Sequence, residues 1–431
     1  MSKSSLDDDL KARDKAFVWH PFTQTYKGVV PLQVKKAEGT LLYGMGDQTY
    51  IDANSSWWVN IHGHGHPHIG KALSEQFSKV DHIIFAGATH EKAVELAERI
   101  CHILPDNLQK VFFSDNGSTA TEVALKMVFQ YFHNQGIEKK RVLAMSGAYH
   151  GDTFGAMSVG ERDKFNAPFE PFFFDVDYLD FPAQENEAEL LRHAESLFQT
   201  GDFCCMILEP LVQGASGMRM YSAEFLDQLT LVAKQNGVIV IFDEVMTGFG
   251  RTGKMFAMNY CKETPDIVTL SKGLTAGVLP MGLTITSNEI FNAFLSPDTT
   301  KAFLHGHSFT ANPLACAVAC ASLDLFEQPE TWKSIESIVQ WNTEFFKELE
   351  TVSTVSNIRQ KGTILAFEVN TEKETTYFSD LRDQLYNYCL DNGIFIRPLG
   401  NVVFINPPYC ITEEEFKHVK EVLLNFLNEL N

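Results

Sequence analysis

Short apolar runs that end in charged residues recur through the middle of the chain, and they constrain its fold more than any other feature. The runs are VFFSD (111–115), RVLAMS (141–146), CCMILEP (204–210), GVIVIFDE (237–244) and DIVTLSKG (266–273). Stretches with helical periodicity separate them, as between Thr119 and Phe132. Strands this apolar are typical of a mostly parallel sheet that helices cover on both faces. The pattern therefore predicts an α/β fold.

The carboxyl ends of these strands carry the candidate functional groups. Ligands of open parallel sheets bind beyond the carboxyl ends of the strands. Four charged side chains stand at or next to such ends: Asp115, Glu209, Asp243 and Lys272. Asp243 and Lys272 end two strands that we expect to be neighbours. They form either a structural ion pair or part of a cofactor site.

The two ends of the chain differ from this central part. A β-hairpin is predicted within residues 39–52, because glycines interrupt two short apolar segments there. The C-terminal part mixes strands with amphipathic helices. We predict a large domain over residues 61–330 and a smaller α+β domain that is built from both chain ends, residues 1–60 and 331–431.

Composition excludes several classes of partner. With 35 Lys and Arg residues against 55 Asp and Glu residues, the net charge of −20 disfavours binding to nucleic acids and anionic lipids. No apolar run approaches the roughly 18–20 residues of a membrane span, and the polar N-terminus does not resemble a signal peptide. The eight cysteines show no CxxC pair and no disulfide spacing. We expect a cytoplasmic protein with reduced thiols.

A glycine-rich segment at Gly248–Lys254 matches two phosphate-binding patterns. Met255 stands where the nucleotide-triphosphate pattern needs a hydroxyl for magnesium. Five residues also separate the preceding strand from the glycines, whereas a dinucleotide site needs the glycines directly after the strand. A turn shaped by packing accounts better for this segment, and a nucleotide-binding ATPase is a weaker alternative.

Histidines alternate with other residues at His62, His64, His66 and His68. This spacing presents imidazoles on one face of an extended segment, as a metal site requires. The intervening glycines and Pro67 indicate a loop instead, in which one or two histidines bond to the backbone. A metal-dependent hydrolase is therefore another alternative.

A helix start follows the first of the central strands, within residues 114–127. Thr119 and Glu122 fit a capping box, which leaves the amides of Gly117 and Ser118 at the helix N-terminus. Such amides bind phosphate groups. The segment is either an ordinary helix start or a phosphate site.

The lysine, the carboxylate and the helix start together match the needs of pyridoxal phosphate (PLP). A lysine forms a Schiff base with this cofactor, and an aspartate keeps its pyridine nitrogen protonated. The helix N-terminus holds the phosphate. Because three groups with different roles fit one cofactor, we predict a PLP site.

Longer motifs resemble the class III aminotransferases, which are fold-type I PLP enzymes. The motifs are VIVIFDEVMTGFGRTGKMFA (238–257), PDIVTLSKGL (265–274) and HGHSFTANPLACA (305–317). Others resemble one member family, the adenosylmethionine–8-amino-7-oxononanoate aminotransferases: WHPFTQ (19–24), SSWWVNIHGHGHP (55–67), AYHGDTFGAMSVG (148–160), QGASGMRMY (213–221) and IRPLGNVVFINPPY (396–409). The resemblance spans nearly the whole chain and implies the fold-type I architecture.

The resemblance also implies roles for individual residues. The catalytic set would be Lys272, which bears the cofactor, with Asp243 and Tyr149. The cofactor-binding set would be Gly117, Ser118, Tyr149, Asp243, Lys272 and, from the other subunit of a homodimer, Ser308. The substrate-binding set would be Trp57, Trp58, Tyr149 and Arg397, whose guanidinium would bind a carboxylate. No metal ligand is implied.

The implied reaction is the PLP-dependent transamination of 8-amino-7-oxononanoate to 7,8-diaminononanoate in biotin biosynthesis. S-adenosyl-L-methionine is the usual amino donor of the member family, and some relatives use lysine. Phe22 and Phe404 stand where many members have tyrosine, so the donor stays open. The alternative is another class III transaminase, acting on ornithine, 4-aminobutyrate or an ω-amino acid with pyruvate.

Overall fold

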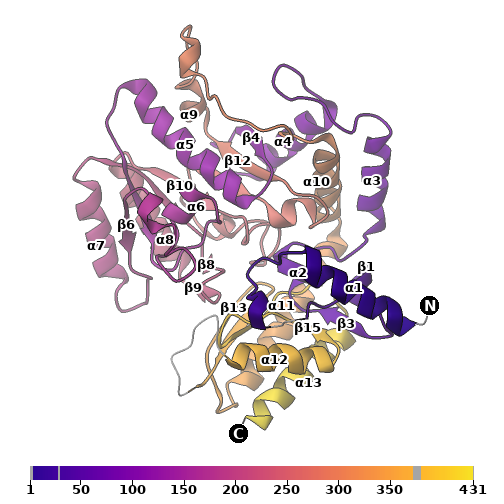
Figure 1. Cartoon of the computed structure of the whole chain (residues 1–431). Helices are drawn as coiled ribbons and strands as arrows, with labels where there is room; N and C mark the ends of the chain where they lie inside the picture. The colour runs from indigo at the N-terminus through magenta and orange to yellow at the C-terminus, as the bar shows by residue number, and fades with distance from the viewer. Residues whose placement is uncertain (1–2, 28–29, 372–379, 431) are drawn as a thin grey trace.

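A seven-stranded sheet lies at the centre of the computed structural model (Figure 1), which describes residues 3–27, 30–371 and 380–430. The outermost residues of the predicted ranges 1–60 and 331–431 lie outside this description. Across the sheet the strands are β4 (Lys110–Ser114), β12 (Gly282–Thr286), β11 (Ile267–Leu270), β10 (Ile239–Asp243), β7 (Phe203–Leu208), β5 (Arg141–Met145) and β6 (Val176–Leu179). Only β12 runs antiparallel to its neighbours, which confirms the predicted, mostly parallel α/β fold.

Both faces of this sheet are buried. In β10, Val240 and Phe242 pack into one apolar cluster, whereas Ile239 and Ile241 pack into the other. Helix α5 (Gly117–Gln135) covers the second face. The first cluster includes residues of α4 (Glu91–Ile103), α7 (Glu187–Phe198), α8 (Ala223–Gln235) and α10 (Pro313–Phe326), among other helices. Burial on two sides explains why the strands are apolar at consecutive positions.

The two ends of the chain share one of the smaller sheets. The four-stranded sheet has the order β1 (Val34–Glu38), β2 (Leu41–Gly44), β3 (Thr49–Asp52) and β15 (Ile394–Phe395). The antiparallel pair β2–β3 confirms the predicted hairpin, and β15 joins β3 in parallel. A second sheet contains β13 (Val355–Lys361), β14 (Ile364–Val369) and β16 (Val402–Ile405). The domain division at residues 60 and 330 stays a prediction.

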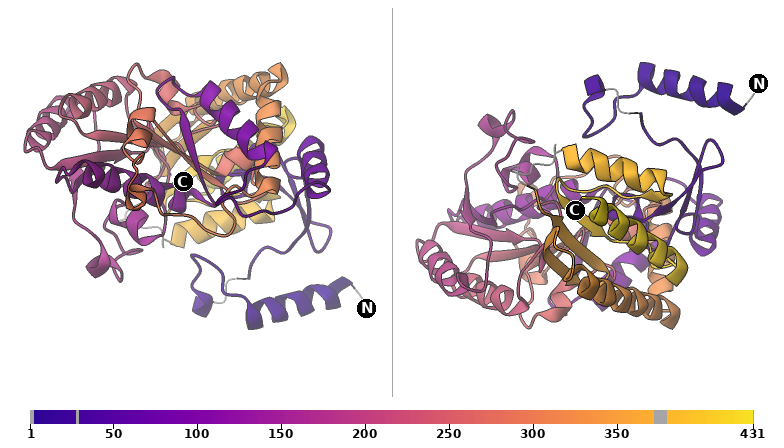
Figure 2. Two further views of the ribbon diagram at one scale, coloured as in Figure 1. Left: turned by 90° about the horizontal axis from the view of Figure 1, so that it is seen from above. Right: turned by 90° about the horizontal axis from the view of Figure 1, so that it is seen from below.

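Helices complete the C-terminal part. They are α11 (Pro329–Leu349), α12 (Asp380–Asp391) and α13 (Glu413–Glu429). Figure 1 shows these orange and yellow elements beside the indigo β1 and β3 of the N-terminal part. Figure 2 shows the first helix, α1 (Lys3–Phe17), standing apart from the rest of the chain.

Two expectations from composition can be compared with the structure. Within the described ranges, no helix has the length and apolar character that crossing a bilayer requires. All eight cysteines carry free thiols, and five of them are buried: Cys204, Cys205, Cys316, Cys320 and Cys389.

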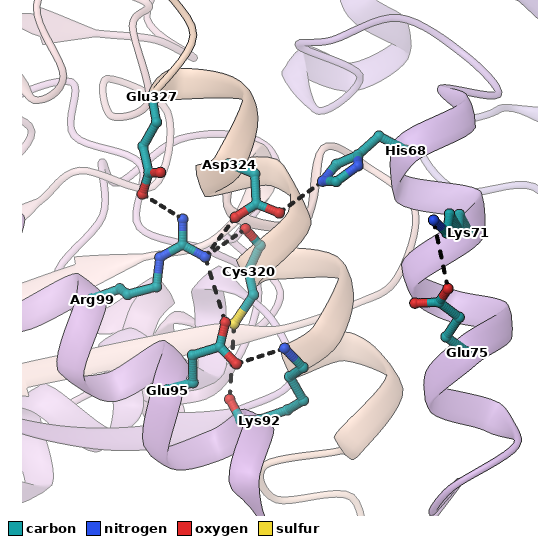
Figure 3. Close-up of polar contacts among 9 residues, drawn as sticks. All are labelled: His68, Lys71, Glu75, Lys92, Glu95, Arg99, Cys320, Asp324 and Glu327. Carbon is teal, nitrogen blue, oxygen red and sulfur yellow. Dashed lines mark hydrogen bonds and ion pairs between the residues drawn. The ribbon is translucent and has the colours of Figure 1, made fainter.

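The alternating histidines contact different partners. His64 Nε2 lies 2.9 Å from Asp52 Oδ2, and His68 Nε2 lies 2.7 Å from Asp324 Oδ2 (Figure 3). Burial lowers the pKa of the His62 imidazole to about 3, which keeps this ring neutral. His62 bonds to the backbone of Ser322, as expected for one or two of these histidines, whereas long-range folding brings carboxylates to His64 and His68. Among the described residues, no three His, Cys, Asp or Glu side chains are grouped as metal ligands.

Asp324, the partner of His68, belongs to a network of ion pairs that holds helix α10 in place. Arg99 of α4 bonds to Asp324 and Glu327, each at 2.8 Å, so α4 is tied to α10 (Figure 3). Asp324 also binds His68 in α3 (Pro67–Phe77). Helix α10 in turn supports the lysine segment, since Ser322 Oγ donates to the carbonyl of Gly273 at 3.4 Å.

Candidate active site

A cavity of about 320 Å³ lies beyond the carboxyl ends of β4, β7, β10 and β11. The predicted site residues that line it are Trp57, Trp58, Gly117, Ser118, Tyr149, Asp243 and Lys272. Glu209 and Asp115, which also follow strands, lie in its wall. Ser308 and Arg397 do not line this cavity. The position agrees with the general location of ligand sites in open parallel sheets.

Lys272 begins the short 3₁₀ turn η4 (Lys272–Thr275), two residues after β11 ends. Its φ angle of 43° lies in the left-handed region, which a non-glycine residue adopts only with support from its surroundings. Burial lowers the pKa of the amine, and the charges of Asp243 and Glu209 act in the opposite direction. A lowered pKa increases the share of neutral amine, the form that acts as a nucleophile or a base.

Asp243 is the last residue of β10, whose neighbour in parallel register is β11. Its Oδ2 lies 2.7 Å from His150 Nδ1, and both side chains are buried. Its Oδ1 accepts hydrogen bonds from the Val245 amide (3.0 Å) and the Thr269 hydroxyl (3.2 Å). Asp243 is therefore hydrogen-bonded to His150 and forms no salt bridge with Lys272, which removes the structural ion pair as an explanation. The fixed carboxylate faces the cavity as an anchored negative charge.

Sequence reasoning did not assign His150 a role. The residue lies inside the AYHG motif, but its pairing with Asp243 depends on two strand ends that meet in space. Its Nε2 is buried and has no hydrogen-bond partner among the described residues.

Helix α5 begins next to the carboxylate of Asp243. Its N-cap is Asn116, whose Oδ1 accepts from the Thr119 amide at 2.9 Å, while the Thr119 hydroxyl accepts from the Asn116 amide at 3.1 Å. The predicted capping box of Thr119 with Glu122 was thus wrong, because the helix starts two residues earlier. Glu122 instead accepts from the amide of Gly155 at 2.6 Å. The amides of Gly117 and Ser118 remain at the helix N-terminus, beside the cavity.

Tyr149 and Glu209 form one wall of the cavity. The Tyr149 hydroxyl donates to Asp152 Oδ2 at 3.1 Å, and burial raises the pKa of the phenol. Glu209 Oε1 accepts from the Tyr149 amide at 3.0 Å, and Oε2 accepts from the Gly214 amide at 2.9 Å. Burial raises the pKa of the Glu209 carboxyl to about 7. Tyr149 therefore stays protonated, and Glu209 titrates near neutral pH.

Three aromatic rings form a stack at the other side. Trp57 and Trp58 lie in α2 (Ser55–Trp58), with ring centres 5.9 Å apart and planes 9° from parallel. Phe22 also stacks with Trp57, with ring centres 6.4 Å apart and planes 13° from parallel. Phe404 meets Trp58 edge to face at 5.9 Å, so both phenylalanines in place of family tyrosines contact the tryptophan pair. A second cavity of about 160 Å³, lined in part by Phe22 and the tryptophans, adjoins this stack.

Arg397 and Ser308 lie outside the first cavity. The guanidinium of Arg397 lies 4.7 Å from the centre of the Trp57 ring, which brings it to the same aromatic stack. Ser308 is exposed in a loop before α10, and nothing in a single chain brings it to the cavity. Its predicted contact with the cofactor stays a prediction, since that contact needs a second subunit.

The glycine-rich segment Gly248–Lys254 serves packing, as expected. The fully buried Arg251 donates to the Pro407 carbonyl at 2.9 Å. Gly250, with a φ angle of +88°, lies so close to the C-terminal part that a Cβ there would approach Ile335 to 2.8 Å. This turn therefore joins the central part of the chain to its C-terminal part.

The fold and the cavity together define a class of enzymes that act on amines and carbonyl compounds through a lysine. Residues 23–427 match the family model described as Aminotransferase class-III, and the chain belongs to this family.

Individual relatives are similar over nearly the full length. An adenosylmethionine-8-amino-7-oxononanoate aminotransferase from Synechococcus elongatus is 42% identical, with 96% of this chain and 99% of the relative covered. The crystal structure of an enzyme of the same name from Methanocaldococcus jannaschii matches with a TM-score of 0.93 and 34% identity, over 98% of this chain and 99% of that one. A PLP-bound amine transaminase from an uncultivated Pseudomonas species matches with a TM-score of 0.90 and 26% identity, over 96% and 99% of the two chains.

Proposed function

We propose that this chain converts 8-amino-7-oxononanoate to 7,8-diaminononanoate in biotin biosynthesis, with S-adenosyl-L-methionine as the amino donor. The observation that carries the proposal is one cavity in which Lys272 and Asp243 lie beside the Trp57–Trp58 pair. The relatives from Synechococcus elongatus and Methanocaldococcus jannaschii, which carry the name of this enzyme, support it. The donor's amino group replaces the ketone oxygen of the acceptor, and the donor leaves as a 2-oxo acid. Because one cavity serves both substrates, they bind in turn, in a ping-pong cycle.

The residues of the cavity fit pyridoxal phosphate. When bound, this cofactor supplies a protonated pyridine ring that withdraws electrons from the reacting carbon of the substrate. The amides of Gly117 and Ser118 bind the phosphate at the start of α5. A Cβ at Gly117 would lie 2.8 Å from Val245, so glycine is needed for the helix to start this close to β10. Asp243, anchored by His150, holds a proton on the pyridine nitrogen.

Lys272 is the base of the reaction. Its lowered pKa favours the neutral amine, which takes a proton from the substrate carbon and later returns one. The Trp58 ring covers the amine and excludes water from that side. Tyr149 lines the same cavity with a protonated hydroxyl, and Asp152 fixes its direction.

The aromatic stack and Arg397 bind the acceptor. The flat indole of Trp57 suits both an aliphatic chain and an adenine ring. Arg397 binds the acceptor's carboxylate through a bidentate, charge-assisted contact. This contact orients the chain of the acceptor so that its ketone faces Lys272.

A homodimer with shared active sites is the second part of the proposal. Leu304 and Phe309 flank Ser308 and are 79% and 63% exposed. The Phe309 ring lies 5.4 Å from that of His82, next to Ile84, which is 62% exposed. A second copy that covers this apolar surface would also bring its Ser308 to the phosphate. We further propose that the dimer works in the cytoplasm. Sedimentation at micromolar concentration tests the assembly, and a monomer with full activity would refute it.

Visible absorbance of the PLP-loaded protein tests the function. We expect the cofactor's absorbance band to disappear when S-adenosyl-L-methionine is added and to return when 8-amino-7-oxononanoate follows. If the band disappears with lysine but not with S-adenosyl-L-methionine, the proposed acceptor stands and the amino donor is lysine. A protein that takes up PLP but responds to neither donor would favour another class III transaminase. A protein that never takes up PLP would refute the proposal.

A further inference from the structure

Asn54 is a buried side chain that joins three separate parts of the candidate substrate site. We propose that it is a positioning residue, which fixes the spacing between the Trp57–Trp58 pair and Arg397. It thereby determines how well the acceptor's carboxylate and aliphatic chain fit between them. The proposal rests on the proposed function, because it concerns how the acceptor is held.

The hydrogen bonds of Asn54 reach two distant segments. Its Oδ1 accepts from the backbone amide of Arg397 at 2.7 Å, across 343 positions of sequence. Its Nδ2 donates to the carbonyl of Phe404 at 3.0 Å, across 350 positions. One carboxamide thus holds both C-terminal segments that contact the tryptophans, since Arg397 lies over Trp57 and Phe404 against Trp58.

The turn that carries the tryptophans needs such support. Ser55, Ser56 and Trp58 have φ angles of 48°, 59° and 68°, in the left-handed region that non-glycine residues rarely adopt. Residues persist in this conformation only where their surroundings fix them. The buried carboxylate of Asp52 supplies part of the support, because it accepts from the Ser56 amide at 2.6 Å. Asn54 lies between Asp52 and the turn and links both to the C-terminal part.

The two contacts require opposite hydrogen-bonding groups on one side chain. A carboxamide offers a donor and an acceptor at once, whereas a carboxylate offers acceptors only. Asn54→Asp therefore keeps an oxygen for the Arg397 amide and loses the bond to the Phe404 carbonyl. Asn54→Ala loses both, which leaves a buried amide and a buried carbonyl without these partners and frees the segments to shift.

The test compares these two variants with Asn342→Ala in the full, PLP-loaded chain. Asn342 is the control for removal of a buried carboxamide, because it lies in α11 away from the cavity and has no hydrogen-bond partner among the described residues. For Asn54→Ala we expect KM for 8-amino-7-oxononanoate to rise about tenfold or more, with a smaller change in kcat. Asn54→Asp should raise KM at least as much, because its buried carboxylate would face the Phe404 carbonyl and lie next to Asp52. The Kd of PLP should stay within about twofold of wild type, since Asn54 bonds to no residue of the cofactor set.

A second measurement needs no turnover. The stacked indoles of Trp57 and Trp58 contribute to near-ultraviolet circular dichroism, and the difference between wild type and Trp57→Phe defines their share. We expect Asn54→Ala to lose most of this share without PLP bound. Asn342→Ala should keep it.

Unchanged KM and an unchanged indole signal in both Asn54 variants would overturn the proposal. Equal losses in Asn54→Ala and Asn342→Ala would also overturn it, because general stability would then explain the effect. Should Asn54→Ala not fold, Asn54→Ser, which keeps a small hydrogen-bonding side chain without a buried charge, carries the comparison alone. If wild type does not turn over the acceptor, the proposed function fails, and the indole signal then decides whether Asn54 fixes the tryptophan turn.

Discussion

The amine of Lys272 lies 4.9 Å from the centre of the Trp58 ring. An indole face attracts a cation, but it offers no hydrogen bond that would compete with a reacting group for the amine. Trp58 stacks on Trp57, and Trp57 lies against Arg397, so one aromatic column joins the reactive lysine to the proposed carboxylate contact. The Trp57 and Trp58 rings therefore set the distance between the amine of Lys272 and the guanidinium of Arg397.

Lys272→Ala is expected to reduce turnover by at least about 10³-fold, since both the nucleophile and the base are removed. The fold should remain intact, as shown by an unchanged far-ultraviolet circular dichroism spectrum. Lys71→Ala on the exposed side of α3 is the control and should keep wild-type rates. Turnover of Lys272→Ala within tenfold of wild type would sink the assignment of the lysine.

Asp243→Asn should leave PLP bound and slow proton removal from the substrate by about 10²–10⁴-fold. The amide cannot hold a proton on the pyridine nitrogen, and the contact of Asp243 with His150 loses its carboxylate. Glu244→Gln is a matched control, because this neighbouring carboxylate is buried and binds the amides of Ala257 and Met258 outside the cavity. Stopped-flow absorbance after donor addition measures the step. Equal rates in the two variants would contradict the role of Asp243.

The pH dependence of stability follows from Glu209. Burial raises the pKa of its carboxyl from 4.5 to about 7, so the folded chain binds this proton more tightly than the unfolded chain. Stability from this group is complete below pH 4.5 and is lost as the pH rises to about 7. The difference amounts to about 3 kcal/mol.

Urea unfolding of the protein without PLP, at pH 5 and pH 8, measures this contribution. Glu209→Gln should lose less stability than wild type over the same interval, because its amide does not titrate. Glu244, whose pKa burial also raises to about 7, should keep contributing in that variant. An identical pH dependence of the two proteins would show that Glu209 ionises normally in the fold.

Arg397→Ala should raise KM for 8-amino-7-oxononanoate by about 10- to 100-fold, which corresponds to the loss of a charge-assisted, bidentate contact. Arg397→Lys should recover only part of this, since an ammonium lacks the fork geometry. The methyl ester of the acceptor provides the counter-test: it should bind wild type poorly and lose little more in Arg397→Ala. Arg192→Ala on the exposed face of α7 serves as the control. If esterification of the acceptor and the Arg397→Ala substitution weaken binding additively, the acceptor's carboxylate binds to a residue other than Arg397.

Local patterns were enough to predict the central sheet and the placement of Asp243 and Lys272 at the ends of neighbouring strands. Asp243 and Lys272 could be placed together because apolar runs mark buried strands, and parallel strands bring their ends to one edge. The start of α5 was predicted two residues late, because Asn116 and Thr119 form a reciprocal cap that competes with the Thr119–Glu122 pattern.

Contacts between distant segments could not be predicted in this way. The pairing of His150 with Asp243 crosses 93 positions, and no local rule selects one histidine among 14. The sequence around Asn54 is that of an ordinary loop, because the hydrogen-bond partners of its side chain lie far along the chain, after β15 and in β16. Strand β15 ends at Phe395, because the Arg397 amide bonds to Asn54 and Pro398 has no amide hydrogen.

The parallel pairing of β3 with β15 also determines when the pocket can form during protein synthesis. Trp57 and Trp58 leave the ribosome early, whereas Arg397 and Phe404 follow only near the end of translation. In the interval, the large sheet can form while the tryptophan turn lacks its C-terminal partners, and exposed apolar surface of this kind promotes aggregation. A nascent chain of this protein therefore passes through a stage in which the tryptophan turn lacks its C-terminal partners. A chain truncated before Ile394 would lack the partners of the tryptophan turn, and the pocket would not form.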